Sequence, residues 1–129
     1  APLFARSRAP VHCLPGNHDL PAEMADLLSR RPFSTDPVVR CGDWTLLLLD
    51  SSVAGAGHGE LGAESLAFLD DTLGRFGDTH ALVVLHHHPV PHGSAWLDAL
   101  MLANADEFFS VLARHGGVRG LAWGHTHQP

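Results

Sequence analysis

The sequence predicts an α/β fold, and three observations support this prediction. Strand-like apolar runs and helix-like amphipathic segments follow one another in the order strand–helix–strand–helix–strand–helix–strand. No internal repeat, low-complexity tract or linker interrupts this order over the 129 residues. Polar clusters stand directly after three of the predicted strands, at the edge where open α/β sheets bind ligands. We therefore expect one domain, or part of one, with its functional residues at a single edge.

The first half of the chain is expected to contain two strands and one helix. The apolar run Val11–Leu14 ends in a Pro-Gly pair, which is typical of a strand that enters a turn. Pro21–Arg30 is expected to be helical, because it begins with proline and carries apolar residues on one face. The segment Pro32–Pro37 ends this helix, and the apolar run Trp44–Leu49 predicts a buried strand.

The second half continues the alternation. Leucines three or four residues apart indicate an amphipathic helix after a loop rich in glycine and serine. The expected elements are, in order, the loop 51–62, the helix Ala63–Phe76, the buried strand Ala81–Leu85, a long loop to about Asp98, the helix Ala105–His115 and the strand Val118–Trp123.

Composition excludes several classes of protein. The net charge of −6, from 8 basic and 14 acidic residues, argues against nucleic acid as a partner. No apolar run of 18 residues is present, so no membrane span is expected, and Ala1–Arg6 lacks the layout of a signal peptide. Cys13 and Cys41 are expected to be free thiols of a cytoplasmic protein. The missing initial methionine suggests truncation.

Histidine is over-represented, with eleven residues, and six of them fall in three short clusters. In Gly16-Asn17-His18-Asp19, the amide oxygen suits a mixed nitrogen and oxygen metal site, and the histidine suits proton donation. Local turn bonding by Asn and Asp is the alternative explanation for this cluster. Scattered surface histidines would be the simplest reading of the composition, and the clustering weakens it.

The other two clusters follow later strands. In His86-His87-His88-Pro89, strand alternation would point the middle ring away from its two neighbours, so the three could not share one ion unless the chain turned sharply. In Gly124-His125-Thr126-His127, residues two apart on an extended segment project the same way, so two imidazoles could reach neighbouring ions.

In this order, with spacings of 70 residues from Asn17 to His87 and 38 from His87 to His125, the clusters resemble the calcineurin-like metallophosphoesterases. This superfamily hydrolyses phosphate esters with two divalent metal ions. The resemblance is to its bacterial cyclic-AMP phosphodiesterase branch and runs from about Val11 to Gln128. The segments that carry it are Leu14–Asp19, Leu47–Ser51, His86–Val90, Gly93–Asp98 and Gly124–Gln128.

The resemblance implies a fold and a set of metal ligands. Residues 1–129 would be the C-terminal portion, truncated at both ends, of a four-layer α/β/β/α sandwich with its ligands on loops after strands. Asn17, His87 and His125 would bind one ion, where His87 is chosen because it lies two residues before the proline. His127 would bind the other ion, and Mn, Fe or Zn would suit these donors.

Further roles follow from the same resemblance. His18 would protonate the leaving oxygen, and Asp19 would orient neighbouring groups. His88 and His92 are candidates for contacts with the ligands or with substrate. Trp96 could stack on a base, although an aromatic residue beside a loop is more often part of a core.

Two motifs of the superfamily are missing from their usual places. Its members open with Asp-x-His and Gly-Asp, whereas Asp78-Thr79-His80, Gly42-Asp43 and Gly77-Asp78 all lead into strands here and should lie at the opposite edge. The second metal site would be incomplete, so the isolated chain is expected to be inactive although its parent is an enzyme.

The expected substrate of that parent is a small phosphoester, with 3′,5′-cyclic AMP preferred because of residues 93–98 and 102–106. Other phosphodiesters, 2′,3′-cyclic nucleotides and phosphomonoesters stay open, as does a non-catalytic domain with a degenerate metal site. A nuclease fits poorly with the acidic composition.

Overall fold

The computed structural model describes residues 9–127, and its main element is a four-stranded sheet with the strand order β3-β4-β5-β6. β4 (Trp44–Leu49), β5 (His80–Leu85) and β6 (Val118–Trp123) are parallel, and β3 (Val38–Cys41) pairs antiparallel with β4 at one edge. The predicted α/β fold is confirmed. The expectations for Ala1–Arg6 and Gln128 concern residues outside the described range.

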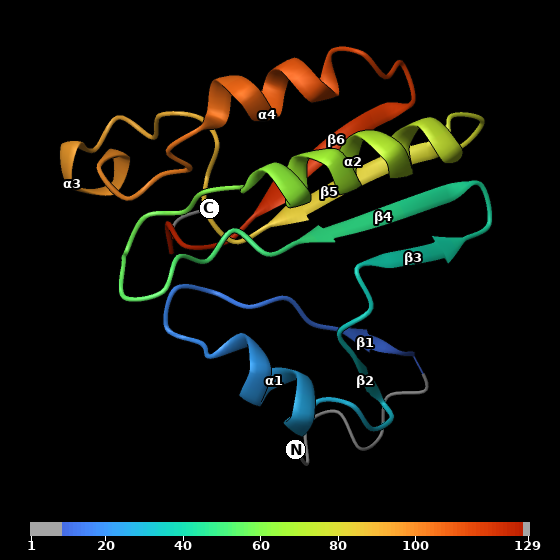
Figure 1. The fold of residues 1–129 in the computed structure, drawn as a ribbon, viewed down its shortest axis with the longest axis horizontal. Helices are drawn as coiled ribbons and strands as arrows, with labels where there is room; N and C mark the ends of the chain where they lie inside the picture. Colours follow the sequence, from blue (N-terminus) through green and yellow to red (C-terminus); the bar gives the residue numbers. More distant parts are fainter. Residues whose placement is uncertain (1–8, 128–129) are drawn as a thin grey trace.

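Two helices, α2 (Ala63–Arg75) and α4 (Ala105–Leu112), lie along one face of this sheet (Figure 1). Alternate strand residues point toward them, as the two-residue period of a strand requires. Leu47 and Leu49 of β4 join Val83 and Leu85 of β5 in a buried core that includes Phe108 of α4. The apolar runs and the leucine spacing therefore form the core that the sequence predicted.

The N-terminal part is a small separate layer that Figure 1 shows beside the sheet, on the side away from α4. β1 (Val11–His12) and β2 (Phe33–Ser34) form a parallel pair of two residues each, and α1 (Pro21–Leu27) connects them. A short helix, α3 (Ala95–Asp98), lies in the long loop after β5.

Several boundaries differ from the prediction. The first strand and the helices expected at Pro21–Arg30 and Ala105–His115 end two or three residues earlier than expected. β2, β3 and α3 were not expected. β3 was missed because it is a half-exposed edge strand without an apolar run, and its pairing depends on a two-residue hairpin turn at Gly42-Asp43 with a positive φ of 57° at the glycine.

The Gly42-Asp43 turn also bears on the expected position of the Gly-Asp and Asp-x-His look-alike motifs. This Gly-Asp pair lies between β3 and β4, and the backbone N–H of His80, at the start of β5, donates to the carbonyl of Asp43. Asp78-Thr79-His80 and Gly77-Asp78 lie at this same end of the sheet, before β5. All three look-alike motifs are therefore at the end opposite the histidine-rich loops, as predicted.

The carboxyl ends of β4, β5 and β6 meet at one end of the sheet, where the loop before α1 and the loop containing α3 also lie (Figure 1). Cys13 and Cys41 are free thiols, as expected. Within residues 9–127, no helix is long and apolar enough to cross a membrane.

Candidate metal centre

Three histidines meet at the carboxyl end of the sheet, and we call them the histidine cluster: His86, His87 and His125. One possible ligand atom from each lies within 4.8 Å of the others. The ring centroids of His87 and His125 are 4.8 Å apart, and those of His86 and His87 are 4.9 Å apart. Two strands that are far apart in sequence thus deliver three imidazoles to one point.

The cluster contains both His86 and His87, which the strand alternation had placed on opposite sides. The sequence allowed this only if the chain turned sharply, and the chain does so: β5 ends at Leu85 and the backbone bends at His86 and His87. The carbonyl of His86 instead accepts a hydrogen bond from the Gly124 N–H at the end of β6. His86 is therefore a site residue that sequence reasoning missed, although the three consecutive histidines were a visible signal.

Two glycines make room for the rings. A Cβ on Gly59 would lie 2.4 Å from Cγ of His87, and a Cβ on Gly16 would lie 2.9 Å from Cε1 of His86. Both distances are too short for real atoms, so a larger residue would displace a ring or the backbone. Gly59 is held in place by bonds to the chain next to Leu102, where its N–H donates to Met101 and its carbonyl accepts from Ala103.

Ser51 fixes the orientation of His87. Its fully buried hydroxyl is 2.9 Å from Nδ1 of His87 and also accepts the backbone N–H of that residue at 3.3 Å. A hydrogen bond to one ring nitrogen aims the other nitrogen at a metal. Sequence reasoning gave Ser51 no role, although Ser51 closes the segment Leu47–Ser51 that carries the family resemblance and lies just after a buried strand.

Two ring nitrogens of the cluster have no hydrogen-bond partner within the part of the chain that the structure describes. They are Nε2 of His87 and Nε2 of His125, and both are buried. An unpaired buried polar atom costs about 1–3 kcal/mol, so native structures seldom retain one without a purpose. Imidazole nitrogens are good donors to Mn, Fe and Zn, and these two atoms therefore fit a divalent cation.

The protonation state of the cluster also suits a cation. Burial, reinforced by the neighbouring imidazoles of His86 and His125, lowers the pKa of His87 to about 4. Burial is also the main cause of the lowered pKa of His86 and of His125. The three rings are accordingly neutral at pH 7, which is the form that binds metal.

The Asn17 loop reaches the cluster from the N-terminal part. Oδ1 of Asn17 is 3.0 Å from Nε2 of His86. The carboxylate of Asp19 accepts the Gly16 N–H at 2.8 Å and so closes the turn that carries Asn17, while His18 is exposed on the same turn. The structure thus brings Asn17 to the cluster and gives Asp19 a bond that holds the loop.

The two histidines after β6 do not form an extended segment. His125 has a φ of 64° and His127 a φ of 52°, in the left-handed region that non-glycine residues seldom adopt. The expectation that they project the same way from an extended chain is therefore wrong. His125 joins the cluster, whereas His127 is exposed and lies outside the group of three. Strained backbone of this kind is often found at functional sites.

His88 lies against the cluster without belonging to it. It is buried, and its ring stacks on that of His125 with 5.9 Å between centroids. The backbone N–H of the exposed His92 donates to Asp98, whose carboxylate is also 3.6 Å from Nε2 of His88. Trp96 is 73% exposed and is not part of the core.

Comparison with known proteins places this arrangement in a family. The family model described as calcineurin-like phosphoesterase matches residues 1–129, and the chain belongs to that family. The family implies divalent metal ions, which agrees with the unpaired nitrogens of the histidine cluster.

The individual relatives that the chain resembles are phosphodiesterases of cyclic nucleotides. The chain is 43% identical over 120 residues to the 3′,5′-cyclic adenosine monophosphate phosphodiesterase CpdA of Haemophilus influenzae, which covers 92% of this chain and 44% of that protein. It is 44% identical over 126 residues to CpdA of Escherichia coli, covering 97% and 46%. A 3′,5′-cyclic-nucleotide phosphodiesterase of Nostoc is 37% identical over 118 residues, covering 92% and 44%. The chain therefore spans less than half the length of these relatives.

Proposed function

We propose that the whole protein hydrolyses a phosphodiester bond and that its substrate is 3′,5′-cyclic AMP or a related cyclic nucleotide. One observation carries this proposal: three histidines bring possible ligand atoms within 4.8 Å of one another at the carboxyl end of the sheet, and two buried nitrogens of this group lack a hydrogen-bond partner among residues 9–127. Membership of the phosphoesterase family and the names of the relatives support the reaction type and the substrate class. We take residues 1–129 to be a portion of the metallophosphoesterase domain.

The ligands of one ion would be Nε2 of His87 and Nε2 of His125, together with the amide oxygen of Asn17. His86 is close enough to that oxygen to hold it or to replace it as a ligand. His127, exposed next to the cluster, would contribute to a second ion, for which the remaining ligands would come from other parts of the protein. Iron, manganese or zinc would suit this donor set. When bound, such ions polarise the phosphoryl oxygens and neutralise their negative charge.

The side chains of this part would orient the substrate and move one proton. His18 is exposed on the turn beside Asn17, and its charge contributes to the lowered pKa of both His86 and His125, which places it within electrostatic range of the cluster. We assign it the role of the acid that protonates the leaving oxygen, a role that histidine commonly has in proton transfer. Asp19 would keep His18 and Asn17 in place by closing their turn.

Metal content gives the first test. We expect a chain extended to the length of the relatives to retain about two divalent ions after purification, and the 129-residue chain one or fewer. His87→Ala and His125→Ala should each reduce this content. His80→Ala is the matched control, because His80 is a histidine at the opposite end of β5 and should leave the content unchanged. If the extended chain retains no metal, the two-metal proposal is wrong.

Substrate preference gives the second test. The extended chain, supplied with manganese, should cleave 3′,5′-cyclic AMP faster than 2′,3′-cyclic nucleotides or p-nitrophenyl phosphate. His18→Ala should lower kcat about 10²- to 10⁴-fold, the usual contribution of a general acid, while leaving metal content intact. A strong preference for monoesters would overturn the cyclic-nucleotide assignment, and a complete lack of turnover with retained metal would favour a non-catalytic domain.

We also place the protein in the cytoplasm, because its two cysteines are unpaired. Immunodetection of the tagged protein in fractionated cells tests this location.

A further inference from the structure

The carboxylate of Asp98 organises the loop that follows the histidine run. Oδ1 accepts the backbone N–H of His92 at 2.6 Å, and Oδ2 accepts that of Gly93 at 3.1 Å. Gly93 has a φ of 87°, a conformation that glycine adopts without strain. The backbone N–H of Asp98 in turn donates to the carbonyl of Ser94 at 2.8 Å. One side chain thus closes residues 92–98 into a compact unit that includes α3.

The same carboxylate faces a buried histidine. Oδ1 of Asp98 is 3.6 Å from Nε2 of His88, whose side chain is only 1% exposed. Neither ring nitrogen of His88 has a hydrogen-bond partner among residues 9–127, and the carboxylate of Asp98 is an anionic group next to this ring. The backbone N–H groups of His92 and Gly93 favour the ionised carboxyl, and the His92 N–H is the main cause of the lowered pKa of Asp98.

His88 also stacks on His125, a member of the histidine cluster. Its ring is nearly parallel to that of His125, with an angle of 20° between planes and 5.9 Å between centroids. His88 is also tied to the core, because its carbonyl accepts the N–H of the buried Leu102 at 3.0 Å. The ring of His125 therefore stacks on a buried ring whose Nε2 lies 3.6 Å from a carboxylate.

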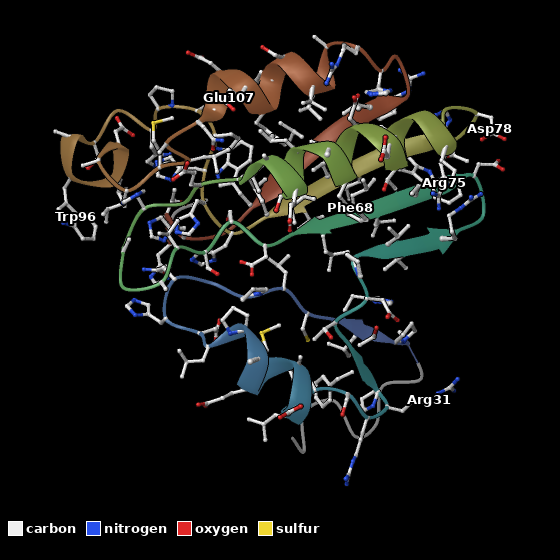
Figure 2. The ribbon with its side chains drawn as sticks, viewed as in Figure 1. Arg31, Phe68, Arg75, Asp78, Trp96 and Glu107 are labelled. Atoms are coloured by element: carbon white, nitrogen blue, oxygen red, sulfur yellow. The ribbon has the colours of Figure 1, made fainter. Side chains whose placement is uncertain are left out.

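We propose that Asp98 is a positioning residue for the histidine cluster: by holding His88 it fixes the orientation of the His125 ring. This role rests on the proposed function in one respect: the fixed orientation of the ring would serve to bind a divalent ion. Trp96 lies on the same closed unit, and Figure 2 shows its side chain at the outer margin of the molecule, away from the core. A change at Asp98 should therefore reach both the cluster and the surface around Trp96.

The test compares Asp98→Asn with the unaltered 129-residue chain. Asparagine keeps the size of the side chain and one oxygen for the loop, but it removes the charge that faces His88. Glu107→Gln is the matched control, since Glu107 is an exposed acid on α4 (Figure 2). The first readout is the imidazole ¹H–¹⁵N spectrum of the metal-free chain. We expect the ring signals of His88 and His125 to shift in Asp98→Asn, whereas those of His80 and His115 keep their positions.

A second variant separates positioning from a merely structural contribution. In a His88→Phe background the stacked ring is retained but has no nitrogen for Asp98 to hold. Adding Asp98→Asn to that background should leave the His125 signals unchanged, although it should still disturb the backbone amides of His92 and Gly93. A loss of stability alone would shift His125 equally in both backgrounds, which would overturn the proposal.

Zinc affinity, measured by calorimetry on the same chains, is the third readout. Partners of metal-ligating histidines commonly contribute 10- to 100-fold to metal affinity, so we expect Asp98→Asn to weaken Zn²⁺ binding about tenfold and Glu107→Gln to leave it unchanged. Unchanged His125 signals in Asp98→Asn would refute the inference whatever the zinc result. Shifted signals in a chain that binds no zinc would instead support the positioning role and count against the proposed metal site.

Discussion

Residues 38–127 and residues 9–34 contribute to the same site but differ sharply in how they are packed. The first region buries a continuous core between the four-stranded sheet and helices α2 and α4. The second consists of two-residue strands and the helix α1, none of whose seven residues is buried. A cleft of about 410 Å³ lies between them, lined by residues of α1, of the end of β4 and of α2, including Phe68, which Figure 2 labels.

The comparison shows how the candidate site is divided. The histidine cluster is built on strands that end in the packed region, and Ser51 and Gly59 fix its rings from the same region. Asn17 comes from the loosely packed region and reaches the cluster through its contact with His86. Paired strands this short are marginal on their own, so we expect the Asn17 loop to be the less stable half of the site.

The largest expected loss of stability comes from a substitution that creates a cavity in the core of the packed region. Phe108→Ala removes a ring that is 0% exposed, and we expect it to lower the free energy of unfolding by about 3–5 kcal/mol. Phe109→Ala, at the neighbouring and 36% exposed position of the same helix, is the control and should cost clearly less. Urea unfolding followed by circular dichroism measures both. Equal losses would show that α4 does not close the core as described.

A smaller effect is expected where the packed region meets the site. In Gly59→Ala the added methyl would overlap the buried ring of His87, and relieving such an overlap typically costs about 1–3 kcal/mol. Gly62→Ala is the matched control, because a Cβ there meets nothing within 4 Å.

The readouts for this pair are the free energy of unfolding and Zn²⁺ affinity. Gly59→Ala should weaken both, since His87 must move to accommodate the methyl group. Gly62→Ala should leave zinc binding unchanged. If Gly59→Ala binds zinc as well as the unaltered chain, His87 is not a ligand in its present orientation.

The same contrast explains which parts of the fold could be predicted from the sequence. The runs Trp44–Leu49 and Ala81–Leu85 and the leucines of α2 were recognisable because each element buries a face, and burial imposes a period on the residues. α1 ended earlier than predicted, at Leu27, because it has no buried face to extend. β2 and β3 depend on pairing with distant strands, and half-exposed strands of two or four residues leave little pattern in a sequence.

The site divides in a similar way. Residue type and strand order pointed to the three histidine-containing clusters, and the resemblance to the metallophosphoesterases selected Asn17, His87 and His125 within them. His86 and Ser51 were missed, since their roles depend on where β5 ends and on a hydroxyl that is 36 residues away from its partner. The left-handed backbone at His125 and His127 was also unforeseeable, because nothing in a Gly-His-Thr-His segment requires it.

The smallest expected effect belongs to the loosely packed region. Leu27 is 77% exposed at the end of α1, and alanine is the better helix former, so Leu27→Ala should change the free energy of unfolding by no more than about 0.5 kcal/mol. Hydrogen exchange on the same protein should show fast exchange at the α1 amides and slow exchange in β4 and β5, because a segment with few buried contacts opens at little cost. A loss of several kcal/mol in Leu27→Ala, or equal protection in both regions, would mean that α1 is covered in solution by something that packs on it. The N-terminal part would then be as firmly fixed as the sheet, and Asn17 would be held as rigidly as the histidines it faces.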